Sequence, residues 1–273
     1  MALTQFHCVL LYRDRVEAIC VLNQERVFED IYNIRRDGAL HALCMDPLEL
    51  KMYTYQKHKV WTYTPFNETR DIWKIYLEQK NYEMAKRYAI GNREHMDIIL
   101  VSQAEHYFKD QRYQDAALTF SQSQLSFEEV ALKFLQVNRK DALKIFLLKK
   151  LESLAPSDST QQTMLTTWLV ELFLNDLGTL KDEGDREGHA KMTQEFHSFL
   201  ETKSLRECLE ANAKTVYDLL SSHGAVEDVV FFAMLMKDYE RVITHHIRQG
   251  KYVEALRVLH RKGSEALEAP EKV

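Results

Sequence analysis

The sequence predicts a mainly α-helical protein in which a short antiparallel β-meander precedes an irregular α-solenoid. Two observations support this fold class. The hydrophobic period changes from about 2 to about 3.6 residues next to Pro65, which marks a switch from strands to helices. One turn pattern then recurs along the helical part of the chain. The 273 residues include only 8 glycines and 4 prolines, a composition that suits helices better than sheets or disorder.

The first part of the chain contains short runs of β-branched and aromatic residues separated by turn-forming residues. A propeller blade has four strands, so six strands are more than one blade and far fewer than a closed propeller needs. A sheet this small has open edges. We expect that it either docks on the helices or belongs to a longer protein, and we favour the second. The predicted strands are residues 5–12, 16–22, 25–31, 39–45, 48–55 and 60–64.

The recurring pattern of the helical part is a polar turn followed by Tyr-x-x-Ala. It occurs at Tyr82, Tyr113 and Tyr252. We expect the tyrosine to cover the turn, and the small alanine three residues later to let the partner helix approach closely. Recurrence of such a unit is typical of an α-solenoid. The spacing does not match the period of about 34 residues of tetratricopeptide repeats, so the predicted solenoid is a looser one.

The pattern also sets the predicted boundaries within the chain. Residues 1–65 are interpreted as the terminal strands of a β-propeller, and residues 66–262 as a solenoid of helical hairpins. Residues 263–273 lack an apolar stripe and are predicted to be a disordered or non-family tail. Within the solenoid, residues 181–188 have two glycines and four acidic residues, which predicts a mobile loop. The helix over 142–154 is apolar on two faces, which predicts that other helices cover both.

Composition excludes several classes of function. The formal net charge is −5, with 36 basic and 41 acidic residues, so no basic excess indicates nucleic acid or anionic lipid as a partner. The four cysteines, at positions 8, 20, 44 and 208, show no C-x-x-C spacing, which argues against a zinc site or a disulfide framework. Such scattered thiols fit a reducing compartment. The N-terminus lacks the basic start of a signal peptide, and no apolar run is long enough to span a bilayer.

A search for chemistry finds four weak candidates. The adjacent pair His245-His246 cannot chelate a metal as two residues one helical turn apart would, so we interpret it as a surface and a groove histidine. Residues 182–185 partly match a calcium loop but lack its alternating acids and closing glutamate. Cys208 is interpreted as a small buried hydrophobe. The sequence therefore predicts no catalytic, cofactor-binding or metal-binding residue. The fourth candidate is a sparse set of lysines, which we expect to lie on a solvated face. They are Lys144, Lys149, Lys150 and Lys181.

Several long segments, in order, indicate a family. They are residues 2–7, 14–18, 127–135, 165–172 and 236–242. Together they resemble the vacuolar protein sorting-associated protein 18 family, called deep orange in flies. A propeller followed by a solenoid is also the plan of vesicle coat and tethering subunits, including the clathrin heavy chain. The resemblance implies a solenoid of the clathrin heavy-chain-repeat type.

The resemblance implies a non-catalytic scaffold of the HOPS and CORVET complexes, which tether membranes before SNARE-driven fusion. The implied partners are the other class C subunits and SNARE-associated factors, with no nucleic acid. The implied location is cytoplasmic, peripheral on late endosomes and on the lysosome or vacuole. The family's zinc is in a C-terminal RING domain, which this chain lacks together with most of the propeller, so we expect no cofactor here. A coat-type or nucleoporin-type scaffold is the alternative, and a helical-repeat enzyme or nucleic-acid binder is a third.

Overall fold

A computed structural model describes residues 1–155 and 158–268, and the chain divides into two compact units. The first unit is Met1–Arg112 and the second begins at Tyr113. The sequence prediction placed its boundary earlier, after residue 65. The three helices that follow the strands therefore belong to the same unit as the strands, and each unit is described by itself below.

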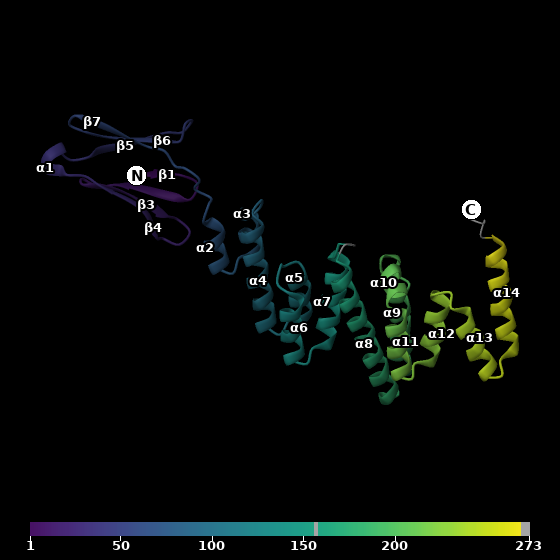
Figure 1. The fold of residues 1–273 in the computed structure, drawn as a ribbon. Coiled ribbons are helices and arrows are strands. Elements are labelled where there is room, and N and C mark those ends of the chain that lie inside the picture. Colours follow the sequence, from purple (N-terminus) through teal and green to yellow (C-terminus); the bar gives the residue numbers. More distant parts are fainter. Residues whose placement is uncertain (156–157, 269–273) are drawn as a thin grey trace. The chain divides into compact units, whose positions relative to one another are not determined.

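The described residues of the first unit form two antiparallel sheets, each with its strands in chain order (Figure 1). All six predicted strands are present, but they do not form one meander. A short helix, α1 (Ile34–Asp37), lies between the two sheets in the chain. Asn33 caps it by accepting hydrogen bonds from the backbone N–H groups of Arg35 and Arg36. A further two-residue strand, β1, is too short to show any alternation in the sequence. One sheet contains β1 (Ala2–Leu3), β2 (His7–Leu11), β3 (Arg15–Cys20) and β4 (Arg26–Ile31), and the other contains β5 (His41–Asp46), β6 (Lys51–Gln56) and β7 (Lys59–Tyr63).

The two sheets share one apolar core. Val9 and Val16 from the first sheet and Met52 from the second are buried in the same cluster, with Trp61 and Tyr63 packed against it. The sheets are also joined by polar groups, because the Tyr32 hydroxyl contacts that of Tyr63. Face-to-face packing of small antiparallel sheets is what neighbouring propeller blades require.

Three helices complete the first unit: α2 (Ile72–Glu78), α3 (Tyr82–Tyr88) and α4 (Arg93–Lys109). Ile72 is buried with Phe6 and Cys20, and the Phe6 and Tyr88 rings lie edge to face at 5.4 Å. The strands therefore dock on the helices, as one of the two alternatives of the sequence analysis states.

The second unit consists of helices packed mainly on their chain neighbours, as the solenoid prediction requires (Figure 1). The prediction that the helix over 142–154 is covered on two faces is confirmed, since α7 packs against α5, α6 and α8. The long helix α8 buries residues on several faces and also contacts α9, α10 and α11. The helices are α5 (Tyr113–Ser121), α6 (Phe127–Gln136), α7 (Lys140–Ser153), α8 (Ser159–Glu183), α9 (Arg186–Leu200), the 3₁₀ helix η1 (Lys203–Leu205), α10 (Arg206–Ala211), α11 (Ala213–Ser222), α12 (Val226–Leu235), α13 (Tyr239–Arg248) and α14 (Tyr252–Glu268).

Seven of the described turns between helices follow one backbone scheme. A residue in the left-handed conformation ends the helix, and the next residue's N–H donates to the carbonyl five positions earlier, as in a Schellman motif. Examples are Asn81 N–H to Tyr76 O at 2.8 Å and Asp238 N–H to Ala233 O at 2.8 Å. Only some of these turns use the glycine that favours a positive φ. The left-handed residues are Lys80, Gln111, Asn138, Gly184, Gly224, Lys237 and Gly250.

The turn pattern read from the sequence is confirmed for its alanines. Ala85 and Ala116 are fully buried and Ala255 is 6% exposed. The tyrosines are less buried than expected. Tyr82 and Tyr113 are partly buried, and Tyr252 is 64% exposed.

Two predicted irregular segments are more regular than expected. The predicted mobile loop at 181–188 is only a tight turn, because Gly184 takes a φ of 74° and Asp185 caps α9 by accepting from Gly188 N–H. The backbone of residues 263–268 continues helix α14, where a disordered or non-family tail was expected. The remaining residues of the predicted tail, 269–273, lie outside the described residues.

Candidate functional site

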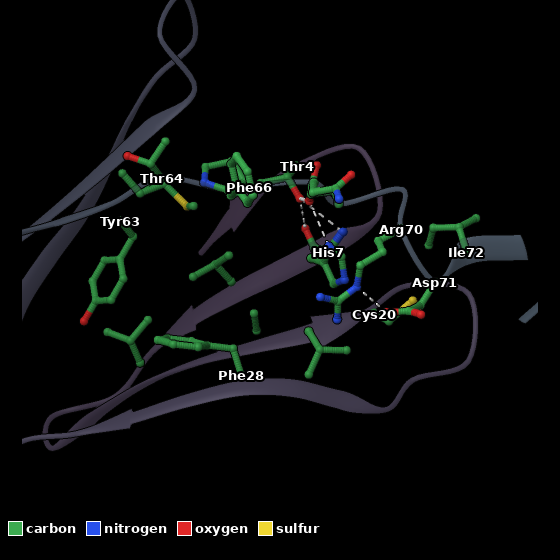
Figure 2. A pocket seen from close by; sticks show the side chains of 18 of the residues that line it. Thr4, His7, Cys20, Phe28, Tyr63, Thr64, Phe66, Arg70, Asp71 and Ile72 are labelled. Carbon is green, nitrogen blue, oxygen red and sulfur yellow. Dashed lines mark hydrogen bonds and ion pairs between the residues drawn. The ribbon is translucent and has the colours of Figure 1, made fainter. Parts of the chain in front are cut away.

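The first unit contains a cavity of about 380 Å³ between its two sheets and the segment that follows β7 (Figure 2). Its walls are mostly apolar, because alternate residues of each strand point to the same side of the sheet. Val16, Ala18 and Cys20 of β3 share this side, and Phe28 and Met52 contribute from β4 and β6. Such a cavity suits an apolar side chain better than a charged ligand.

A carboxylate of the segment after β7 lies in the wall of this cavity and binds residues near the N-terminus. Glu68 accepts a hydrogen bond from the Thr4 hydroxyl, and its Oε1 lies 2.8 Å from His7 Nδ1. Both side chains of the His7–Glu68 pair are mostly buried, with 15% and 17% exposure. On the cavity wall, burial raises the pKa of Tyr63 to about 12, so its phenol is neutral at physiological pH. The arrangement fastens the segment after β7 to residues 4–7 at the start of the chain.

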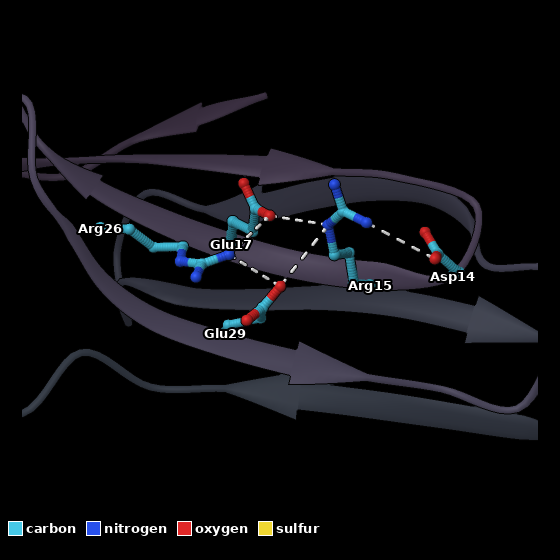
Figure 3. A network of polar contacts seen from close by, with 5 residues as sticks. All are labelled: Asp14, Arg15, Glu17, Arg26 and Glu29. Atoms are coloured by element: carbon cyan, nitrogen blue, oxygen red, sulfur yellow. Dashed lines mark hydrogen bonds and ion pairs between the residues drawn. The ribbon is translucent and has the colours of Figure 1, made fainter.

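Charged residues on β3 and β4 form a network (Figure 3). Glu17 is 7% exposed and lies opposite Glu29 on the neighbouring strand. Arg15 Nε lies 2.6 Å from Glu17 Oε1, and Arg26 Nη1 lies 2.9 Å from Glu29 Oε1. Two like charges directly opposite each other would destabilise the strand pair, and the two guanidinium groups offset this repulsion. The sheet is therefore apolar on its cavity side, and strands β3 and β4 also carry a network of paired charges.

In the second unit, two histidine–carboxylate pairs link helices that are distant in sequence. His197 Nε2 on α9 lies 2.7 Å from Asp228 Oδ1 on α12, and the His197 ring stacks on Phe231 at a centroid distance of 3.6 Å. His223, after α11, lies 3.2 Å from both carboxylate oxygens of Glu171 on α8. The partners are 31 and 52 residues apart, so no motif in the sequence revealed them.

One residue of each pair, Asp228 and His223, lines an open hollow of about 650 Å³ between the α8–α9 turn and the α11–α12 turn. Its lining mixes both signs of charge, including Lys181, Asp185, Arg186 and Glu227. A mixed lining favours neither an anion nor a cation. The histidine pairs therefore act as links between neighbouring hairpins.

The candidates taken from the sequence do not come together. His245 and His246 have their ring centroids 5.8 Å apart and at 68° to each other. Among the side chains that the structure describes, no group of three from His, Cys, Asp or Glu is placed to hold a metal. Residues 182 and 183 belong to helix α8, and Gly184 and Asp185 form its turn. Cys208 is buried near the hydroxyl of Thr166, with the sulfur 3.7 Å from that oxygen.

One of the four lysines expected on a solvated face has a different setting. Lys144 has a side chain only 12% exposed, and it joins α7 to α8 by contacting Asp176. Its ammonium also lies 4.3 Å from the centre of the Phe173 ring, which is a cation–π contact. Lys150 donates to the Ser123 carbonyl at 3.2 Å, and Lys149 pairs with Glu152 at the surface.

In the described part of the chain, no helix combines the length and apolarity that a membrane crossing needs.

Comparison with known proteins gives a consistent result over both parts of the chain. The family model for the "Pep3/Vps18/deep orange beta-propeller domain" matches residues 1–65, and that for the "VPS18, alpha-solenoid domain, first half" matches residues 69–238. The chain is 42% identical over 260 residues to the vacuolar protein sorting-associated protein 18 homolog of Danio rerio, 95% of this chain and 27% of that protein. It is 34% identical to vacuolar sorting protein 18 of Arabidopsis thaliana, over 96% of this chain and 27% of that protein.

A more distant relative is the vacuolar membrane protein pep3 of Schizosaccharomyces pombe, which is 29% identical over 95% of this chain and 29% of its own length. The chain thus spans between a quarter and a third of the length of the curated relatives that it matches. The strands match the family's propeller and the helices match its solenoid, in the order found in the structure. The chain belongs to the vacuolar protein sorting-associated protein 18 family.

Proposed function

We propose that this chain is part of a non-catalytic scaffold subunit of the HOPS and CORVET tethering complexes. In this role it acts in vesicle docking and fusion, in autophagy, and in protein transport from endosomes to the lysosome or vacuole. The observation that carries the proposal is the match of both domains to the vacuolar protein sorting-associated protein 18 family. The names of the relatives, which refer to vacuolar sorting and to the vacuolar membrane, support it.

The described residues are consistent with a geometric mechanism. Each helical hairpin packs on its chain neighbours, and links such as His197–Asp228 and Lys144–Asp176 fix adjacent helices against each other. Solenoids bind partners through extended surfaces. The scaffold would hold the other class C subunits and SNARE-associated factors at a fixed separation, and would reach late endosomal and lysosomal or vacuolar membranes through the complex.

Affinity purification of the tagged chain from cells, followed by mass spectrometry, tests the assignment. We expect enrichment of the other class C subunits over the tag alone, and competition by untagged chain. Enrichment of coat or nuclear-pore subunits would favour the alternative scaffold of the same architecture. Recovery of neither set above the tag control would contradict both.

The same proposal includes the absence of an enzymatic role and of a bound zinc ion. The four free cysteines, which show no zinc-ligand spacing, support it. Metal analysis of the purified chain should find much less than one zinc per chain. One tightly bound zinc per chain would overturn this part.

A further inference from the structure

Three connections of the first unit meet at one end of its two sheets. They are the β2–β3 turn, the β4–β5 connection that contains α1, and the β6–β7 turn, because antiparallel strands return every second connection to the same end. Leu40 N–H donates to Arg13 O at 2.9 Å, which joins the first two. The Gln56 amide donates to Gly38 O at 2.9 Å, which joins the last two. We call this surface the α1 end, and it consists of residues 12–14, 32–40 and 57–58.

The two ends of the sheets differ in charge. The α1 end contains four basic and two acidic residues. The connections at the opposite end contain two acidic residues and no basic residue, and helix α2 packs there, since Phe6 is buried with Ile72. The net charge of −5 therefore averages over unlike surfaces, and the composition of the whole chain does not reveal the positive one. The connections of the opposite end are residues 4–6, 21–25 and 47–50.

The basic residues of the α1 end lack acidic partners. Its two acidic residues are already paired with cations of the strands. Lys59 Nζ lies 2.8 Å from Asp37 Oδ1, and Arg15 Nη1 lies 3.6 Å from Asp14 Oδ2. Three of the four basic residues are arginines, whose planar guanidinium group matches the geometry of a phosphate. All four are exposed, and in the described part of the chain they form no ion pair: Arg13, Arg35, Arg36 and Lys57.

Apolar side chains lie among these cations. Ile34, which precedes Arg35 in α1, is 43% exposed, and Tyr12 is 40% exposed. Protein surfaces that bind membranes combine arginine and lysine with apolar and aromatic side chains that enter the headgroup region. An acidic protein segment would pair with the cations but gives no reason for Ile34 and Tyr12 to be exposed beside them. The combination therefore favours a membrane.

We propose that the α1 end binds the surface of an anionic phospholipid membrane. Its four unpaired cations would contact lipid phosphates, and Ile34 and Tyr12 would enter the boundary between headgroups and acyl chains. The cations come from three separate connections, which fits a broad charged surface. The proposal goes beyond the proposed function, in which the chain reaches membranes only through its complex, because it gives the chain a membrane contact of its own.

Vesicle flotation of the full chain tests the proposal. One set of vesicles contains phosphatidylcholine with about 30% phosphatidylserine, and the other contains phosphatidylcholine alone. We expect the chain to bind the first set and not the second. Binding should decrease at least about fivefold when the salt concentration is raised from about 50 to about 300 mM, because salt screens the attraction.

A matched pair of triple variants locates the contact. Both remove three exposed positive charges from the first unit, so their net charges are equal. The α1-end variant should bind phosphatidylserine vesicles at least about tenfold more weakly, because a basic residue at a membrane surface contributes about fivefold to binding. The control should lose less than about twofold. The α1-end variant carries Arg35→Gln, Arg36→Gln and Lys57→Gln, and the control carries Lys80→Gln, Arg87→Gln and Arg93→Gln.

Hydrogen exchange of the unmodified chain gives a second measurement, which does not depend on the folding of any variant. The amides of residues 33–37 should exchange more slowly with phosphatidylserine vesicles than without them, whereas those of residues 21–25 should not change. Ile34→Asn should weaken binding a few-fold without changing its salt dependence, because it removes apolar contact and no charge.

Several outcomes would overturn the proposal. One is equal binding to both sets of vesicles, and another is an equal loss in the two triple variants that circular dichroism shows to be folded. Slower exchange at residues 21–25 instead of 33–37 is a third. Binding of a polyglutamate peptide without binding to phosphatidylserine vesicles would show that an acidic protein segment is the partner instead. Because the samples contain no other subunit, any of these results would leave the tethering assignment intact.

Discussion

The helical hairpins of the second unit and the two sheets of the first unit differ in how completely they bury their apolar side chains. The largest fully buried side chains, among them Phe120, Phe134 and Phe146, lie on helices. In the sheets, the shared core borders a cavity of about 380 Å³. Hairpins cover one another with chain neighbours, so a short stretch closes its own core. Sheets of a propeller need neighbours from distant sequence.

The loss of stability should differ most between the two units when a buried side chain of each core is truncated. Phe134 is fully buried between Phe120 and Phe146, with ring centroids 6.3 and 6.4 Å away, so Phe134→Ala should destabilise by about 3–5 kcal/mol. Met52→Ala should cost less, about 2 kcal/mol, because Met52 already borders a cavity. Urea unfolding of the two variants decides the order. Equal costs would show that the sheets are packed as completely as the helices.

A second prediction concerns the links between hairpins. Asp228 is 8% exposed and its carboxylate lies 2.7 Å from His197 Nε2. His197→Ala should destabilise by about 2–3 kcal/mol, because it leaves a buried carboxylate without this partner. The double variant with Asp228→Ala should cost less than the sum of the two single changes. Additive costs in urea unfolding would show that the two side chains do not act as a pair.

A third prediction tests the close approach of helices at the turns. Ala116 is fully buried, so Ala116→Leu should destabilise by about 1–3 kcal/mol through overpacking. Leu118, on the same helix, is 39% exposed, and Leu118→Ala serves as the control with an effect below about 1 kcal/mol. Similar midpoints for Ala116→Leu and the unmodified chain would contradict the hairpin interpretation.

A smaller effect is expected from the left-handed turn residues. Lys80, Gln111, Asn138 and Lys237 take positive φ values of 54–62°, which L-residues other than glycine adopt at a cost. Changing Lys237 to glycine should stabilise by roughly 0.5–1 kcal/mol, and Gly184→Ala, at a φ of 74°, should destabilise by a similar amount. No atom lies within 4 Å of the added Cβ at Gly184, so that control isolates backbone strain. Thermal unfolding shifts of the same sign would refute the explanation.

The smallest expected effect is a pH dependence at His245. Burial, with added repulsion from His246, Lys251 and Arg248, lowers the pKa of His245 in the folded chain. The unfolded chain then binds more protons between the lowered pKa and the ordinary value of about 6.5, so stability falls as pH drops through that window. His245→Gln should flatten this fall in urea midpoints measured from pH 7.5 downward to about 5. An unchanged slope would mean that His245 does not contribute to it.

The sequence by itself determined the parts of this protein that depend on near neighbours in the chain. The change of period at Pro65, the six main strands, the buried alanines of the turns and the two covered faces of α7 all follow from spacings within one or two turns or strands. Long matching segments also indicated the family, which the comparisons confirmed.

Only the tertiary structure decided what depends on residues far apart in sequence. It separated the strands into two sheets and brought Phe6 and Cys20 onto Ile72. It also paired His197 with Asp228 and placed Glu17 opposite Glu29 on the neighbouring strand. The type of a residue predicts that it will be buried or paired, but it does not identify the residue that it contacts. That contact depends on loop closure and on competing contacts across the fold. Residue type also fails to predict the left-handed backbone of the four non-glycine turn residues. The packing of the two joined helices holds a conformation that these residue types disfavour.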